Sequence, residues 1–216
     1  MNEKALKKYI KETPTQSERS NLLFGILVFP IFFIGIPLLA PPFHLSYIIL
    51  IVPFIILDIW VLLYRFSKAY HSKKQDSQFY LIRGIFGCLS SFGCFLASQK
   101  VAYTMLMLDT FWYFILTFLG YLLILFLHFK TRLNKLKETP KKKKNQNVGN
   151  KVAVAATAAA FGSLVYNLFL RYSSENTMAI ILMIILFIFS IIVMHFILDL
   201  HKYMLIKAHV EKGKQI

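Results

Sequence analysis

The chain has 216 residues, of which 57% are hydrophobic, 16% aromatic and only 16% charged, and its formal net charge is +15. About a quarter of the residues of a water-soluble domain are charged, and a disordered chain is poor in large apolar residues, whereas this chain has 21 phenylalanines. Composition therefore excludes both classes and predicts a membrane protein, without indicating an activity.

The N-terminal part of the chain combines a basic tail with a first apolar run. Residues 1–21 are polar, and residues 3–12 place lysines opposite apolar side chains, which predicts a short helix along the membrane interface. The apolar run 22–40 contains Pro30 and Pro37. Each proline removes a backbone donor and bends a helix. Such broken spans occur as simple bends and also at transport sites, so both interpretations stay open.

Six apolar runs are long enough to cross a hydrocarbon core of about 30 Å, which takes roughly 20 helical residues. The predicted spans are 22–40, 45–64, 79–98, 108–129, 152–170 and 178–198. We expect an all-α, polytopic transmembrane helical bundle of six spans arranged as three hairpins, with no folded domain outside the membrane. One alternative starts the fourth span earlier, because Val101 to Leu108 is also apolar, and would bury Asp109.

Lysine and arginine alternate between the successive connections. The tail 1–21, the loops 65–78 and 130–151, and the tail 199–216 are basic, whereas the other connections contain few basic residues. This positive-inside pattern predicts that both termini lie in the cytoplasm. Because the basic residues lie between apolar runs, we expect them to contact anionic lipid headgroups and not nucleic acid. The most basic stretch comprises Lys141, Lys142, Lys143 and Lys144.

Small residues concentrate in the third and fifth spans. Small side chains four apart allow helix backbones to approach closely, which predicts an inner seam between these two spans, with the bulky second, fourth and sixth spans outside. The same spacing is typical of ordinary packing within one subunit and of a dimer face. The seam candidates are Gly84, Gly87 and Ser91 in the third span and Ala155, Ala159 and Gly162 in the fifth.

Two ionisable residues stand out inside predicted spans, where a central charge costs roughly 2.5–3.5 kcal/mol. Asp58 and Arg83 lie about 9 and 6 Å from the cytoplasmic ends of their helices, from the helical rise. We expect an ion pair between them, with a structural or an ion-coupling role. In the alternative, Arg83 extends to lipid phosphates and Asp58 is hydrated beside Arg65.

Three further titratable residues lie at the inner ends of two spans: His195 and Asp199 are four apart at the end of the sixth, and His128 ends the fourth at a similar depth. They are weak candidates for a proton relay, and their spacing matches no metal-binding motif. Cys88 and Cys94 are turned about 240° apart on one helix, so they cannot form a disulfide with each other and are interpreted as packing residues. We therefore expect no metal, cofactor or catalytic residue.

The favoured function follows by elimination, because the sequence contains no catalytic motif and leaves no room for a soluble domain. We expect a bacterial plasma-membrane protein that acts by intramembrane contact with another membrane protein or a second copy of itself. The favoured form is an immunity protein that protects its host against a membrane-active toxin or bacteriocin. The alternative is a transport subunit, either a small permease with a partner ATPase or an ion-coupled carrier. An intramembrane enzyme is the third possibility.

Overall fold

The computed structural model describes residues 14, 16–43, 45–66, 76–137 and 174–211 of the chain. The described residues form helices and short connections, with no strand among them. The elements are α2 (Gln16–Pro30), η1 (Ile31–Gly35), α3 (Ile36–Leu39), α4 (Ser46–Phe66), α5 (Asp76–Thr104), α6 (Phe111–Lys137), α8 (Glu175–Val193), η4 (Met194–Ile197) and α9 (Leu198–Glu211).

Four described segments are long and apolar enough to cross a membrane, and a shorter apolar helix covers Phe24–Leu39. The four segments are Tyr47–Tyr64, Ser77–Thr104, Phe111–Thr131 and Glu175–Ala208. They correspond to the second, third, fourth and sixth predicted spans. The fifth predicted span, 152–170, lies outside the described residues. The all-helical architecture and several membrane-length helices are thus established.

Several helices extend beyond the predicted spans. The segment from Val101 to Thr104 continues α5, whereas Asp109 is exposed in the connection before α6. The alternative with an early fourth span and a buried Asp109 is therefore wrong. At the other end of the chain, α9 continues to Glu211, so most of the predicted tail 199–216 is helical.

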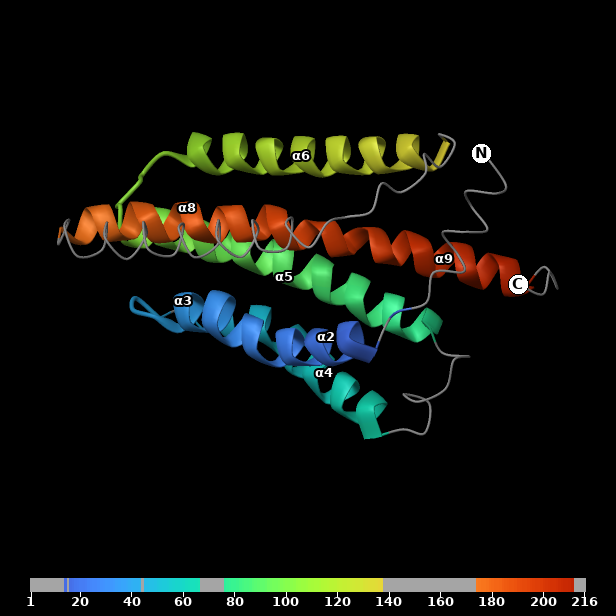
Figure 1. Cartoon of the computed structure of the whole chain (residues 1–216). Helices are drawn as coiled ribbons and strands as arrows, with labels where there is room; N and C mark the ends of the chain where they lie inside the picture. The colour runs from blue at the N-terminus through green and yellow to red at the C-terminus, as the bar shows by residue number, and fades with distance from the viewer. Residues whose placement is uncertain (1–13, 15, 44, 67–75, 138–173, 212–216) are drawn as a thin grey trace, which may run out of the picture.

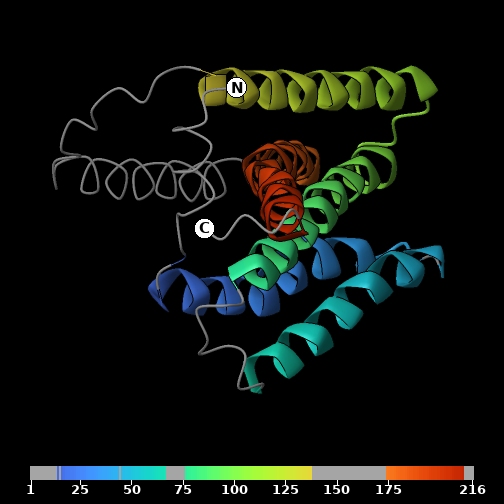
Figure 2. The same ribbon diagram turned by 90° about the vertical axis from the view of Figure 1, so that its right-hand side faces the viewer.

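Helix α5 is the central element of the bundle. One side of it packs against α8, η4 and α9, and another side packs against α2, η1, α3 and α4. Figures 1 and 2 show α6 on the far side of α8 and α9 from α2 and α4. Because of this arrangement, α5 has contacts on most of its circumference, and its residues account for much of the buried core.

Glycines on opposite sides of α5 allow the neighbouring helices to approach. A Cβ atom on Gly84 would lie 2.7 Å from the backbone nitrogen of Leu200 in α9. A Cβ on Gly93, about 180° around the helix at 100° per residue, would lie 2.8 Å from the Ile34 side chain in η1. Backbone approach of this kind is typical of helix packing in membranes, where small residues allow the close van der Waals contact that holds helices together.

The sixth predicted span continues as one long helical segment through α8, η4 and α9. Ser174 caps its start, where the hydroxyl group accepts a hydrogen bond from the Thr177 backbone nitrogen at 3.3 Å. Such a cap supplies an acceptor to a backbone donor that has no partner within the helix. The short 3-10 turn η4 interrupts the α-helical pattern at Met194–Ile197, beside the packing contact with Gly87.

Candidate functional site

The ion pair of Arg83 differs from the predicted one. Arg83 Nε lies 3.0 Å from Asp199 Oδ2, and no ion pair within the described residues joins Arg83 to Asp58. The predicted pairing used depth along the helices, which carries no information about the direction in which each side chain projects. Arg83 lies on the α5 face that meets α9, whereas Asp58 lies on α4, beside the first helix.

Aromatic rings surround the Arg83 guanidinium. Its central carbon lies 4.6 Å from the ring centroid of Phe196 and 5.9 Å from that of Phe79. Cation–π contacts stabilise a guanidinium that has left water, and the carboxylate of Asp199 balances its charge. Arg83 therefore joins the start of α5 to the η4–α9 region by charge and by ring contacts.

The three proton-relay candidates lie in the same region. The rings of His128 and His195 meet edge to face with centroids 5.4 Å apart, and Asp199 lies one turn beyond His195. Asp199 is engaged by Arg83, which makes it part of an ion pair. Among the described residues, no group of three or more His, Cys, Asp or Glu side chains is arranged to hold a metal ion. A relay among these groups remains a prediction.

The seam residues of the third span lie against the sixth span. Gly84 and Gly87 face α9 and η4, and Ser91 faces α8. The Ser91 hydroxyl donates to the Ser190 carbonyl oxygen at 2.8 Å, and the Ser190 hydroxyl donates to the Ser91 carbonyl oxygen at 2.8 Å. The sixth span thus packs directly against the seam residues of the third span, although the sequence predicted a seam between the third and fifth spans.

The remaining predicted site residues lie outside the described residues. They are the fifth-span seam candidates Ala155, Ala159 and Gly162 and the basic residues Lys141, Lys142, Lys143 and Lys144.

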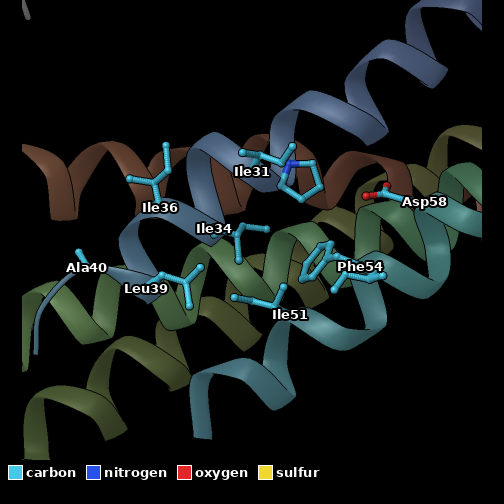
Figure 3. A pocket seen from close by; sticks show the side chains of 11 residues that line it. Ile31, Ile34, Ile36, Leu39, Ala40, Ile51, Phe54 and Asp58 are labelled. Atoms are coloured by element: carbon cyan, nitrogen blue, oxygen red, sulfur yellow. The ribbon is translucent and has the colours of Figure 1, made fainter. Parts of the chain in front are cut away.

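A groove with a volume of about 470 Å³ lies between the first helix and α4. Figure 3 shows Asp58 at one end of it and Ile36, Leu39 and Ala40 toward the other end. Apart from Asp58, the walls are apolar. The lining residues are Pro30, Ile31, Ile34, Gly35, Ile36, Leu39, Ala40, Ile51, Phe54, Ile55 and Asp58.

Proline chemistry explains why the first helix is irregular beside this groove. Pro30 has no backbone donor for the carbonyl of Ile26, one turn earlier, so the regular helical ladder stops there. The chain continues as the π-helical segment η1, in which the Ile36 backbone nitrogen donates to the Ile31 carbonyl oxygen. Segments of π-helix are frequent at functional sites because they change the direction of neighbouring side chains.

The Asp58 carboxylate lies at the polar end of the groove, well inside the length of α4. Asp58 follows the start of α4 by 12 residues, which corresponds to a depth of about 18 Å. Its Oδ1 atom is buried and accepts no hydrogen bond from any described residue. An ionisable side chain within a membrane segment is a functional candidate, and a buried carboxylate oxygen without a partner strengthens that candidacy for Asp58.

The positions of Pro30 and Asp58 relative to the connection between the first two spans could have predicted this groove. Counted from the connection between the first two spans, Pro30 lies 10 residues before Ala40 and Asp58 lies 12 residues after Ser46. In an antiparallel hairpin, these separations place the proline and the carboxylate at similar depths, about 15 and 18 Å. The broken backbone and the carboxylate could therefore have been assigned to one site.

Two buried lysines were also missed. Lys100 Nζ donates to the carbonyl oxygens of Leu38, at 2.7 Å, and of Ala40. Lys202 Nζ donates to the Tyr80 hydroxyl at 2.8 Å. Lys100 was the single basic residue of a connection expected at 99–107, and its isolation there was the only available signal. Both lysines join helices and do not line the groove.

No family model, no curated protein and no solved structure matches the chain.

Proposed function

We propose that this chain is a six-span protein of a bacterial plasma membrane, with both termini in the cytoplasm, that acts by binding a partner within the bilayer. The membrane-length helices support the location, and the alternation of basic and uncharged connections supports the orientation. The favoured partner is a membrane-active toxin or bacteriocin, and binding it would protect the host.

The observation that carries this proposal is the groove between η1–α3 and α4. Its outer rim is formed by exposed apolar side chains, among them Ile31, Ile36 and Ile55, so the hollow opens toward the surrounding lipid. A partner with an apolar surface reaches such a site from the bilayer without crossing water. Its volume of about 470 Å³ lies within the usual range of ligand sites.

Resistance in a sensitive host tests the proposal. Expression of the full chain should protect cells against the toxin whose gene neighbours the gene of this protein, seen as survival in a killing curve. An unchanged killing curve, at confirmed expression in the membrane, would discard the immunity function.

Two matched variants connect the protection to the groove. Ile55→Trp adds a large side chain at the exposed groove rim, whereas Leu119→Trp adds the same side chain to an exposed position of α6. We expect Ile55→Trp to lose protection and Leu119→Trp to retain it, at equal expression. Equal protection by both variants would remove the groove from the mechanism.

A transport subunit is the second candidate, favoured by the proline-broken first helix beside Asp58. Transporters bind substrates near the middle of the membrane at interrupted helices. Copurification of an ATPase, or accumulation of a solute that depends on an ion gradient, would favour transport over immunity.

A further inference from the structure

The groove is chemically asymmetric, and its asymmetry indicates the kind of ligand that it fits. Ten of its lining residues are apolar or glycine, and Asp58 is the one that carries an ionisable group. In Figure 3 the Asp58 carboxylate is directed toward the groove from one end. A ligand that fills the hollow therefore meets apolar walls along its body and a single carboxylate at one end.

Asp58 forms no ion pair with any of the described residues. Arg83, the cation expected from the sequence, is bound to Asp199 on the other side of α5. Lys100 is bound to carbonyl oxygens at the end of the first helix. An ionised carboxylate within a span is costly, and a ligand cation that approached it would remove much of that cost.

We propose that the groove binds a hydrophobic cation, with its apolar body against Ile34, Ile51 and Phe54 and its positive charge at the Asp58 carboxylate. This inference rests on the proposed function in that it uses the same groove, and it names the chemistry of the ligand. Attraction between opposite charges is strong where water is scarce.

The depth of Asp58 separates such a ligand from a membrane phospholipid. The carboxylate lies about 18 Å from one end of α4 and about 12 Å from the other, at the helical rise. Both distances place it inside the hydrocarbon region, away from the phosphates of either leaflet. A cation whose charge is shielded by apolar groups reaches this depth, whereas a phospholipid headgroup stays at the interface.

Two ions of similar shape and opposite charge test the proposal directly. Tetraphenylphosphonium and tetraphenylborate each carry four phenyl rings around one central charge. Equilibrium dialysis would measure each ion against the full chain in nanodiscs of zwitterionic lipid, with empty nanodiscs subtracted. We expect saturable binding of the phosphonium ion and at least about tenfold weaker binding of the borate ion, a difference typical of one favourable charge contact.

Variants assign the binding to Asp58. We expect Asp58→Asn to weaken phosphonium binding at least about tenfold, Asp58→Glu to retain it, and Asp109→Asn, a change at an exposed carboxylate outside the groove, to leave it unchanged. Ile55→Trp should abolish binding with Asp58 intact, and Leu119→Trp should not. If Asp58→Asn does not elute as a folded species, the comparison of the two ions and the Ile55→Trp variant decide the question.

Three outcomes would overturn the proposal. Equal saturable binding of both ions, unaffected by Asp58→Asn, would show that the groove takes apolar bodies whatever their charge. Phosphonium binding that survives Ile55→Trp would place the site elsewhere. Absence of saturable binding of either ion would show that the groove does not bind a hydrophobic cation. The toxin-resistance assay is independent of all three, so retained protection with failed cation binding would leave the proposed function standing.

Discussion

Arg83 and Asp199, which are 116 positions apart in the sequence, form an ion pair with Nε 3.0 Å from Oδ2 at the junction of α5 with α9. Both side chains are mostly buried, with 24% and 17% of their surfaces exposed. A partly buried pair contributes more through the cost of breaking it than through its own attraction, because removal of one partner leaves the other charge without compensation.

The first prediction concerns this pair. Arg83→Gln should destabilise the folded bundle by roughly 1–3 kcal/mol, because it leaves the Asp199 carboxylate uncompensated. The loss should appear as a lower thermal unfolding midpoint, followed by circular dichroism in detergent. The charge-exchanged double variant Arg83→Asp with Asp199→Arg should recover part of the stability that Arg83→Asp loses.

A second exchange serves as the control for the partner. Arg83→Asp combined with Asp58→Arg should recover nothing, because Asp58 lies in the groove on α4. Recovery in this combination, and not with Asp199→Arg, would reinstate the pairing inferred from depth alone.

The second prediction concerns close packing at the α5 glycines. A Cβ on Gly87 would lie 2.7 Å from Phe196 Cβ and 2.9 Å from the Ile197 backbone nitrogen, so backbone would have to shift. Gly87→Ala should therefore cost about 1–3 kcal/mol of unfolding free energy, the usual range for overpacking. Gly120 on α6 has no heavy atom within 4 Å of the same position, which makes Gly120→Ala the matched control.

The control is expected to change stability in the opposite direction. Alanine lowers the backbone entropy of the unfolded chain, so Gly120→Ala should be neutral or stabilising by up to about 1 kcal/mol. Equal effects of the two substitutions, measured as unfolding midpoints, would mean that Gly87 is not at a close helix contact.

Hydropathy predicted where the helices lie more accurately than where they end. The expected span 45–64 agrees closely with α4 at Ser46–Phe66, because its residues are almost uniformly apolar. The third span was expected to end at 98, but α5 continues to Thr104. The part of α5 beyond residue 98 contains Gln99 and Lys100, polar residues that are typical of a connection. Both are buried, because Thr117 and the first helix supply their hydrogen-bond partners.

The site was less accessible to sequence reasoning than the helices. The sequence identified Asp58 and Arg83 as important, since ionisable residues in spans are costly, and Asp199 as a weak candidate for a proton relay. It could not identify their partners, because the rotation of each helix about its axis follows from tertiary packing. The seam on α5 illustrates the same limit. The spacing of Gly84 and Gly87 predicted a close helix contact, but it did not indicate that the partner is the bulky sixth span.

The third prediction concerns the paired serines of α5 and α8. The single hydroxyl hydrogen of Ser91 goes to the Ser190 carbonyl oxygen, so the Tyr121 hydroxyl, 2.8 Å from Ser91 Oγ, is the donor in that contact. Ser91→Ala removes both hydrogen bonds and should cost about 1.2 kcal/mol, at about 0.6 kcal/mol for each bond of this kind in a membrane.

Ser90 provides the matched control for Ser91. Its side chain is also fully buried, and its hydroxyl has no hydrogen-bond partner among the described residues. Ser90→Ala should be neutral or slightly stabilising, since it removes a buried polar group without breaking a bond. A larger loss for Ser90→Ala than for Ser91→Ala, in unfolding midpoints of the two variants, would contradict the hydrogen-bond assignment.

The last prediction concerns Lys100, which holds the end of the first helix against α5. Its ammonium group donates to the carbonyl oxygens of Leu38 and Ala40 and lies 4.7 Å from the ring centroid of Tyr47. Carbonyl groups at a helix C-terminus have no partner within the helix and carry a partial negative charge, so a cation there satisfies both requirements. Lys100→Met keeps the length of the side chain but removes the donors, and should destabilise the bundle by about 2–4 kcal/mol.

Lys130→Met, at an exposed position of α6, should change stability by less than about 0.5 kcal/mol. Because the first helix forms one wall of the groove, Lys100→Met should also weaken phosphonium binding by displacing that wall. A Lys100→Met protein with an unchanged unfolding midpoint and unchanged phosphonium affinity would show that the lysine does not position the first helix.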